Sequence, residues 1–147
     1  MKDIVIINGP NLNMLGTREP EIYGHETLEN IRSLCNEWAT SLSLKVDFRQ
    51  SNHEGELVTW IQEAGSKASG VIINPAAFGH TSVALMDALL SIKIPAIEVH
   101  LSNIYKREEF RHHTYTARAV HGVISGLGSH GYVLALYALS DILKKNA

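Results

Sequence analysis

The feature that most constrains the fold is a run of four apolar residues near the N-terminus, Ile4 to Ile7. All four are β-branched, and no polar residue alternates with them, which is typical of a strand buried on both faces. The run ends at Asn8, and residues 9–24 then contain three glycines and two prolines without a steady period. We therefore expect a central strand whose end leads into a long, mobile lid loop, an arrangement in which many α/β proteins place a functional site.

The rest of the chain alternates further apolar runs with segments whose apolar residues recur at steps of three and four. The runs predict strands and the spaced segments predict amphipathic helices. The expected strands are 4–7, 44–48, 71–74, 96–100 and 120–124, and the expected helices are 28–42 (with Thr27 as N-cap), 57–68, 83–90 and 132–144. This alternation predicts a flavodoxin-like, doubly wound, five-stranded parallel sheet with helices on both faces, in one domain spanning residues 1–147.

Composition narrows the class of protein. The 147 residues suffice for one domain with a proper core, and a net charge of −2 offers no footprint for nucleic acid. No apolar stretch reaches membrane-spanning length, and the short N-terminus before the first strand leaves no room for a signal peptide. Cys35 is the only cysteine, so an internal disulfide and a thiolate metal cluster are excluded. We expect a cytoplasmic protein.

Polar residues stand where three expected strands end: Asn8, Asn74 and His100. Ligands of doubly wound sheets bind at the carboxyl ends of the strands, so these residues are candidates for a site. Glu98 and His100 lie on the same side of their strand, and the carboxylate can orient the ring and hold its protonation state. The pair suits an acid–base histidine. A zinc hydrolase is a weaker alternative, because the chain lacks an H-x-x-x-H or H-E-x-x-H pattern.

Two groups of polar residues in irregular segments complete the candidates. Tyr23 is either a residue that packs over a ligand or a base, since Arg18 in the same loop can lower the pKa of its phenol. Beyond the fourth strand, four cationic or titratable residues form either a solvated surface or a cover over a small anion: Arg107, Arg111, His112 and His113. Asn11, Asn13, Asn74 and Asn103 add neutral hydrogen-bonding groups at loop starts.

A glycine-rich stretch, residues 126–131, matches the G-x-G-x-x-G string of dinucleotide-binding proteins and lies between a strand and a helix. The fingerprint requires a following βα unit and an acidic residue about twenty positions on, and the chain ends first. Close backbone packing at the last strand–helix turn is the favoured interpretation. A nucleotide- or flavin-binding module remains the alternative from another class of function.

Taken together, the motifs resemble those of the type II 3-dehydroquinate dehydratases, in order and over nearly the whole chain. The matching strings are NGPNLNMLG (8–16), REPEIYG (18–24), QSNHEG (50–55), NPAA (74–77), HTSVAL (80–85), IEVHLSN (97–103), REEFRH (107–112) and GVISGLG (122–128), followed by Gly131 and Tyr132. The resemblance implies a lyase that converts 3-dehydroquinate to 3-dehydroshikimate and water, the third step of the shikimate pathway. It also implies that neither a metal nor an organic cofactor is needed.

The same resemblance implies roles for particular residues. Tyr23 would be the base, with Arg18 favouring its phenolate and Asn11 helping a water to stabilise the enolate. His100 would protonate the leaving hydroxyl, with Glu98 setting its state. The residues implied to bind substrate are Asn74, Leu101 and Ser102 for its carboxylate and His80, Asp87 and Arg111 for its hydroxyls. Asp87 would reach the site of a neighbouring subunit, in a dodecamer of four trimers.

Two positions depart from the family pattern: Gly79 replaces a usual threonine, and Met86 replaces a common arginine. The first loosens the loop around His80, and the second removes a charge near Asp87.

A Schiff-base dehydratase would give the same product. The sequence shows no apolar pocket around its lysines, among them Lys45, Lys93 and Lys106. Aromatic synthesis and quinate breakdown use the same chemistry, so the sequence leaves both roles open.

Overall fold

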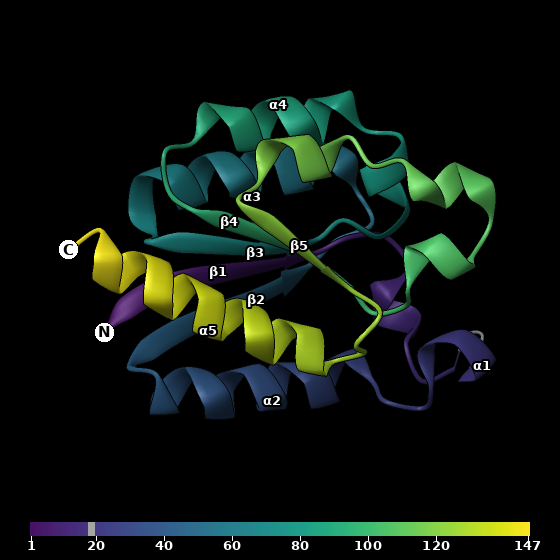
Figure 1. Ribbon diagram of the computed structural model, residues 1–147, viewed down its shortest axis with the longest axis horizontal. Coiled ribbons are helices and arrows are strands. Elements are labelled where there is room, and N and C mark those ends of the chain that lie inside the picture. The colour runs from purple at the N-terminus through teal and green to yellow at the C-terminus, as the bar shows by residue number, and fades with distance from the viewer. Residues whose placement is uncertain (18–19) are drawn as a thin grey trace.

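The structure, a computed structural model, describes residues 1–17 and 20–147, and of residues 22 and 23 it describes the backbone. Its centre is a parallel sheet of five strands in the order β2-β1-β3-β4-β5, shown in Figure 1. The strands are β1 Lys2–Asn8, β2 Leu44–Gln50, β3 Gly70–Asn74, β4 Ala96–His100 and β5 Gly122–Ser125. The predicted doubly wound, five-stranded parallel sheet is confirmed.

Helices cover both faces of the sheet, so the strand β1 is buried on each side. Helices α2 (Leu28–Ser41) and α5 (His130–Lys145) lie on one face, and α3 (Glu54–Lys67) and α4 (Val83–Ser91) on the other (Figure 1). Alternate residues of β1 point into the two cores: Ile4 and Ile6 pack with α2 and α5, whereas Val5 and Ile7 pack with α3 and α4. This explains why the first apolar run shows no polar alternation.

The start of α2 is set by local hydrogen bonds, as the sequence predicts. The side chain of Thr27 accepts a bond from the backbone N–H of Asn30, and the side chain of Asn30 accepts one from the N–H of Thr27. This capping box satisfies two donors that a helix start otherwise leaves unpaired.

Several predicted boundaries are wrong by a few residues. Helix α3 begins at Glu54 rather than at 57, because its first turn is polar and exposed and lies before the first buried residue of the apolar stripe, Leu57. Strand β5 spans 122–125 rather than 120–124, since its ladder with β4 begins at the pair Ile97–Gly122.

The segments predicted to be irregular contain short helices. Within residues 9–24, the helix α1 (Pro20–Tyr23) starts at a proline, which is well suited to the first helical position. The short 3₁₀ helices are η1 Leu12–Met14, η2 Ala76–His80, η3 Ile104–Lys106, η4 Glu109–His112 and η5 Thr116–Ala119. In the part of the chain that the structure describes, no helix is long and apolar enough to span a membrane.

The carboxyl ends of the strands meet at one edge of the sheet. Asn8 is paired in register with Asn74, and the N–H of Gly9 donates to the carbonyl of Asn74 at 2.8 Å. A Cβ on Gly9 would lie 2.4 Å from the carbonyl oxygen of Pro75, so this close approach of two loops requires glycine.

Candidate active site

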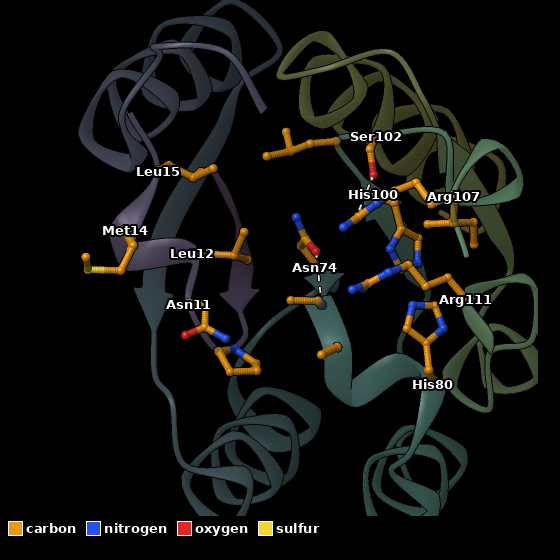
Figure 2. A pocket seen from close by; sticks show the side chains of 15 residues that line it. Asn11, Leu12, Met14, Leu15, Asn74, His80, His100, Ser102, Arg107 and Arg111 are labelled. Atoms are coloured by element: carbon orange, nitrogen blue, oxygen red, sulfur yellow. Dashed lines mark hydrogen bonds between the residues drawn. The ribbon is translucent and has the colours of Figure 1, made fainter. Parts of the chain in front are cut away.

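A cavity opens at this edge, between the loop after β1 and the segments that follow β3 and β4 (Figure 2). Its lining combines an apolar wall with polar groups from three strand ends. The lining residues are Pro10, Asn11, Leu12, Met14, Leu15, Asn74, Ala76, Ala77, His80, His100, Leu101, Ser102, Ile104, Arg107 and Arg111. Eight of the candidate residues named from the sequence are therefore brought together here: Asn11, Asn74, His80, His100, Leu101, Ser102, Arg107 and Arg111.

A buried carboxylate lies behind the histidine of this cavity. Nε2 of His100 lies 2.6 Å from Oε2 of Glu98, and the two residues are 4% and 0% exposed. The ring N–H donates to the carboxylate, which leaves Nδ1 as the nitrogen that can exchange a proton with a ligand. The predicted same-side arrangement of Glu98 and His100 is thus observed.

Thr114, which the sequence analysis did not single out, holds the same carboxylate. Its hydroxyl donates to Oε2 of Glu98 at 3.1 Å, and it lies 3.4 Å from the hydroxyl of Thr116. Both threonines are buried. Oε1 of Glu98 is buried without a hydrogen-bond partner among the residues described. No sequence signal links Thr114 to Glu98, because it lies in an irregular segment 16 residues away.

His80 lies beside His100 on the same side of the cavity (Figure 2). The two rings are stacked, with centroids 6.1 Å apart and planes 21° apart. Nδ1 of His80 lies 2.8 Å from the carbonyl oxygen of His113, so it carries the proton and donates. Burial lowers the pKa of His80, the bond to His113 opposes this, and the charges of His100 and Arg111 lower it further. His80 is therefore a neutral ring whose Nε2 can accept a hydrogen bond.

Two arginines supply positive charge to the cavity. Arg107 donates from Nη1 to the hydroxyl of Ser102 at 3.3 Å (Figure 2), and Arg111 donates to Oε1 of Glu108 at 3.2 Å. The other two members of the predicted cationic cluster, His112 and His113, are exposed and lie outside the lining. The cluster is thus divided: its arginines face the cavity and its histidines face solvent.

The loop after β1 forms the opposite wall. Asn11 adopts a left-handed conformation with φ of 69°, and its N–H donates to Oδ1 of Asn52 at 2.9 Å. Gln50 donates to the same oxygen and to the carbonyl of Gly9, both at 3.1 Å. These bonds tie the first half of the loop to the end of β2.

Two predicted site residues, Arg18 and Tyr23, lie wholly or partly outside the described residues, and a third, Asp87, is described but does not line the cavity. Arg18 lies outside the described residues, and so does the side chain of Tyr23, whose backbone ends α1. Asp87 is exposed on α4 and is absent from the described lining. Val83 and Leu90, one helical turn before and after it, are exposed apolar residues on the same face.

The structure gives a steric reason for glycine at position 79, where the family usually has threonine. Gly79 is buried in η2, and a Cβ there would lie 2.9 Å from Cγ of Pro75 and 3.3 Å from the hydroxyl of Thr116. A larger residue would therefore require the Pro75 ring to move. The glycine lets this loop pack closely over the Thr114–Thr116 pair rather than only loosening it.

The glycine-rich stretch, residues 126–131, has a structural role. The N–H of Gly126 donates to the carbonyl of His100, and the N–H of Gly128 donates to that of Leu101. Gly126 has φ of +92°, and a Cβ there would lie 2.9 Å from Cβ of Asn103. These donors are already used, so the turn supports the end of β4 rather than cradling a phosphate.

The geometry gives little support to a catalytic lysine or to a zinc centre. Lys45, Lys93 and Lys106 are exposed and do not line the cavity. Across residues 1–17 and 20–147, no group of three His, Cys, Asp or Glu side chains is placed to hold a metal ion.

A doubly wound α/β domain with a buried carboxylate–histidine pair at its strand ends is typical of an enzyme that moves protons. Residues 2–140 match the model of the family described as dehydroquinase class II. The 3-dehydroquinate dehydratase of Rhizobium meliloti strain 1021 is 57% identical over 143 residues, which cover 97% of each chain. That of Brucella canis is 56% identical over 144 residues, covering 98% of this chain and 92% of the relative.

Solved structures agree with this match. The crystal structure of the type II dehydroquinase from Propionibacterium acnes superposes with a TM-score of 0.93 at 45% identity, covering 96% of this chain and 97% of that one. A second, from Butyrivibrio crossotus, gives a TM-score of 0.92 at 46% identity, covering 94% of this chain and 97% of that one. The chain belongs to the class II dehydroquinase family, and the resemblance seen in its motifs is confirmed.

Proposed function

We propose that this protein catalyses the reversible dehydration of 3-dehydroquinate to 3-dehydroshikimate, the third step of the shikimate pathway. Relatives more than half identical over nearly the full chain carry the name of this activity. The observation that carries the proposal is the buried Glu98–His100 pair facing a cavity that also presents Asn74, Ser102 and Arg111. An elimination needs an acid for its leaving hydroxide, and a histidine held in this way supplies one.

The reaction begins with proton removal from the carbon next to the ketone. Tyr23 is the proposed base, and Arg18 stabilises its phenolate by charge. Both belong to the lid, residues 9–24, whose glycines 16 and 24 have positive φ and suit a hinge. Asn11 holds a water against the enolate oxygen, where negative charge develops.

The reaction ends with loss of the hydroxyl group as water. His100 donates the proton from the ring nitrogen that does not face Glu98, and the carboxylate stabilises the imidazolium before transfer. The electron pair of the enolate then forms the new double bond as the carbon–oxygen bond breaks. No cofactor is required, because the substrate ketone itself stabilises the intermediate.

Substrate binding uses the polar rim of the cavity. Asn74 and the loop at Leu101 and Ser102 bind the carboxylate, and His80 and Arg111 bind ring hydroxyls. Asp87 completes the site of a neighbouring subunit in a dodecamer of four trimers in the cytoplasm. The exposed Val83 and Leu90 on its helix face support a contact with another copy there.

The direct test is ultraviolet detection of the conjugated enone after 3-dehydroquinate is added to chelator-treated protein. We expect absorbance to rise at the rate of the untreated enzyme. Treatment with borohydride in the presence of substrate should leave the protein mass unchanged. Absence of the enone would contradict the proposed function, and a stable lysine adduct would favour the Schiff-base route.

A further inference from the structure

Three buried side chains from distant parts of the chain form a line of hydrogen bonds beneath the cavity. The hydroxyl of Tyr132 donates to Oδ1 of Asn8 at 2.6 Å and accepts from Nδ2 of Asn74 at 2.9 Å. Asn8 and Tyr132 are 0% exposed and Asn74 is 3% exposed. Asn74 lines the cavity, whereas Asn8 and Tyr132 do not.

At Asn8, the end of this line away from the cavity, the orientation of the side-chain amide is fixed. Nδ2 of Asn8 donates to the backbone carbonyl of Arg49 at 2.9 Å, and a carbonyl can only accept. Asn8 must therefore turn its oxygen toward Tyr132. The hydroxyl of Tyr132 has one hydrogen, which this oxygen takes, so the hydroxyl can only accept from Asn74.

At Asn74, the end of the line that faces the cavity, the hydrogen bonds require the same orientation. Oδ1 of Asn74 accepts from the N–H of Ala76 at 3.1 Å, as Figure 2 shows. If the amide of Asn74 were reversed, its NH₂ group would face the N–H of Ala76, and both groups are donors. Its oxygen would face the hydroxyl oxygen of Tyr132, whose one hydrogen is already donated to Asn8. Such mismatches are costly in a buried place. Burial also raises the pKa of Tyr132, so the hydroxyl keeps its hydrogen.

The amide of Asn74 carries two N–H groups, and Tyr132 takes one of them. With its oxygen turned to Ala76, the group left for the cavity is the second N–H. We propose that Asn8 and Tyr132 are positioning residues that fix Asn74 as a hydrogen-bond donor, so that this wall binds an acceptor oxygen of the ligand, such as one of a carboxylate. The proposal rests on the proposed function, in which Asn74 binds the substrate carboxylate.

The first test is the variant Tyr132→Phe, assayed for dehydration of 3-dehydroquinate. Removing the hydroxyl frees Asn74 to turn, so we expect KM to rise about tenfold, as for a weakened bond to a charged group. We expect kcat to change by less than about twofold, because the carboxylate does not react. Tyr137→Phe is the matched control: this tyrosine lies on the same helix, is half exposed and packs its ring on Trp38.

A double-variant experiment distinguishes a positioning role of Tyr132 from a general loss of structure. In an Asn74→Ala background, Tyr132→Phe should raise KM no further, because the group through which it acts is gone. Asn8→Leu provides a second route to the same result should Tyr132→Phe fail to fold. The side chain of Asn8 bonds to the hydroxyl of Tyr132, which accepts from Asn74, and so sets the direction of that hydroxyl; Asn8→Leu should therefore also raise KM.

Each other outcome has a defined meaning. Equal rises in KM from Tyr132→Phe in both backgrounds, or no rise in the parent, would overturn the positioning role and leave the proposed function standing. An unchanged KM in Asn74→Ala would overturn carboxylate binding by Asn74 and the positioning role with it. Failure of the unchanged protein to dehydrate the substrate would contradict both.

Discussion

At the scale of single residues, the strongest feature is a carboxylate with no exposed surface bonded to the histidine that lines the cavity. The alternation of side chains along a strand predicts that Glu98 and His100 share a side, and the structure places them 2.6 Å apart. Other bonds in the site could not be predicted. Tyr132 reads as the start of a helix, and the hydroxyl bond that joins it to Asn8 spans 124 residues of sequence.

The lowered pKa of His80 predicts how the free energy of unfolding changes with pH. Burial lowers that pKa from its ordinary value, so as pH falls the unfolded chain takes up a proton at His80 before the folded protein does. Acid therefore reduces the free energy of unfolding through this residue. We expect His80→Gln to lose less of that free energy than the parent between about pH 7.5 and pH 5.5, measured by urea denaturation.

The control for this experiment is His53→Gln, which changes an exposed histidine before α3. A His80→Gln protein with the parent's slope would contradict the assignment of a lowered pKa to His80.

At the scale of elements, the apolar runs and spacings predict the sheet well, because burial on two faces leaves a strong pattern in β1, β3 and β4. The pattern fails where contacts between distant segments decide the conformation. Residues 101–119 carry no period, and they form three short 3₁₀ helices, between which Thr114 bonds to Glu98. The pairing of β5 with β4, rather than its own apolar run, sets where that strand begins.

The junction of β1 with the loop after β3 gives a prediction at this scale. Gly9→Ala places a methyl group against the carbonyl of Pro75, and we expect it to lower the free energy of unfolding by about 1–3 kcal/mol. Turnover should also fall, because Asn74 and Asn11 flank the two sides of this contact. Urea denaturation and the enone assay measure both effects.

Gly55→Ala is the matched substitution, since nothing lies within 4 Å of a Cβ at Gly55 and the residue is in the first turn of α3. Alanine favours a helix over glycine, so this variant should be no less stable than the parent. Equal stability of the two variants would show that the close approach at Gly9 does not constrain the fold.

At the scale of the whole molecule, the carboxylate of Asp87 is exposed on α4 and does not line the cavity of its own chain. If Asp87 completes a neighbouring site, mixed assemblies of Asp87→Ala and His100→Ala subunits contain some sites with both native residues. Refolding the two inactive variants together should then restore activity, to about a quarter of the parent value for random mixing in a symmetric ring. The enone assay on the mixture, with each variant refolded alone as control, measures this.

A mixture that stays as inactive as its parents would contradict a shared site. Activity retained by Asp87→Ala alone would remove the carboxylate from substrate binding.

The account's central claim is that one residue removes a proton from the carbon next to the ketone and another delivers a proton to the leaving hydroxyl, with an enolate between the two steps. The most direct measurement is deuterium uptake at the carbon next to the ketone, followed by mass spectrometry of 3-dehydroquinate in D₂O. We predict that His100→Ala still exchanges this hydrogen while enone formation falls by a factor of about 10²–10⁴, and that Tyr23→Phe loses both. Loss of exchange in His100→Ala together with retained exchange in Tyr23→Phe would contradict the claim.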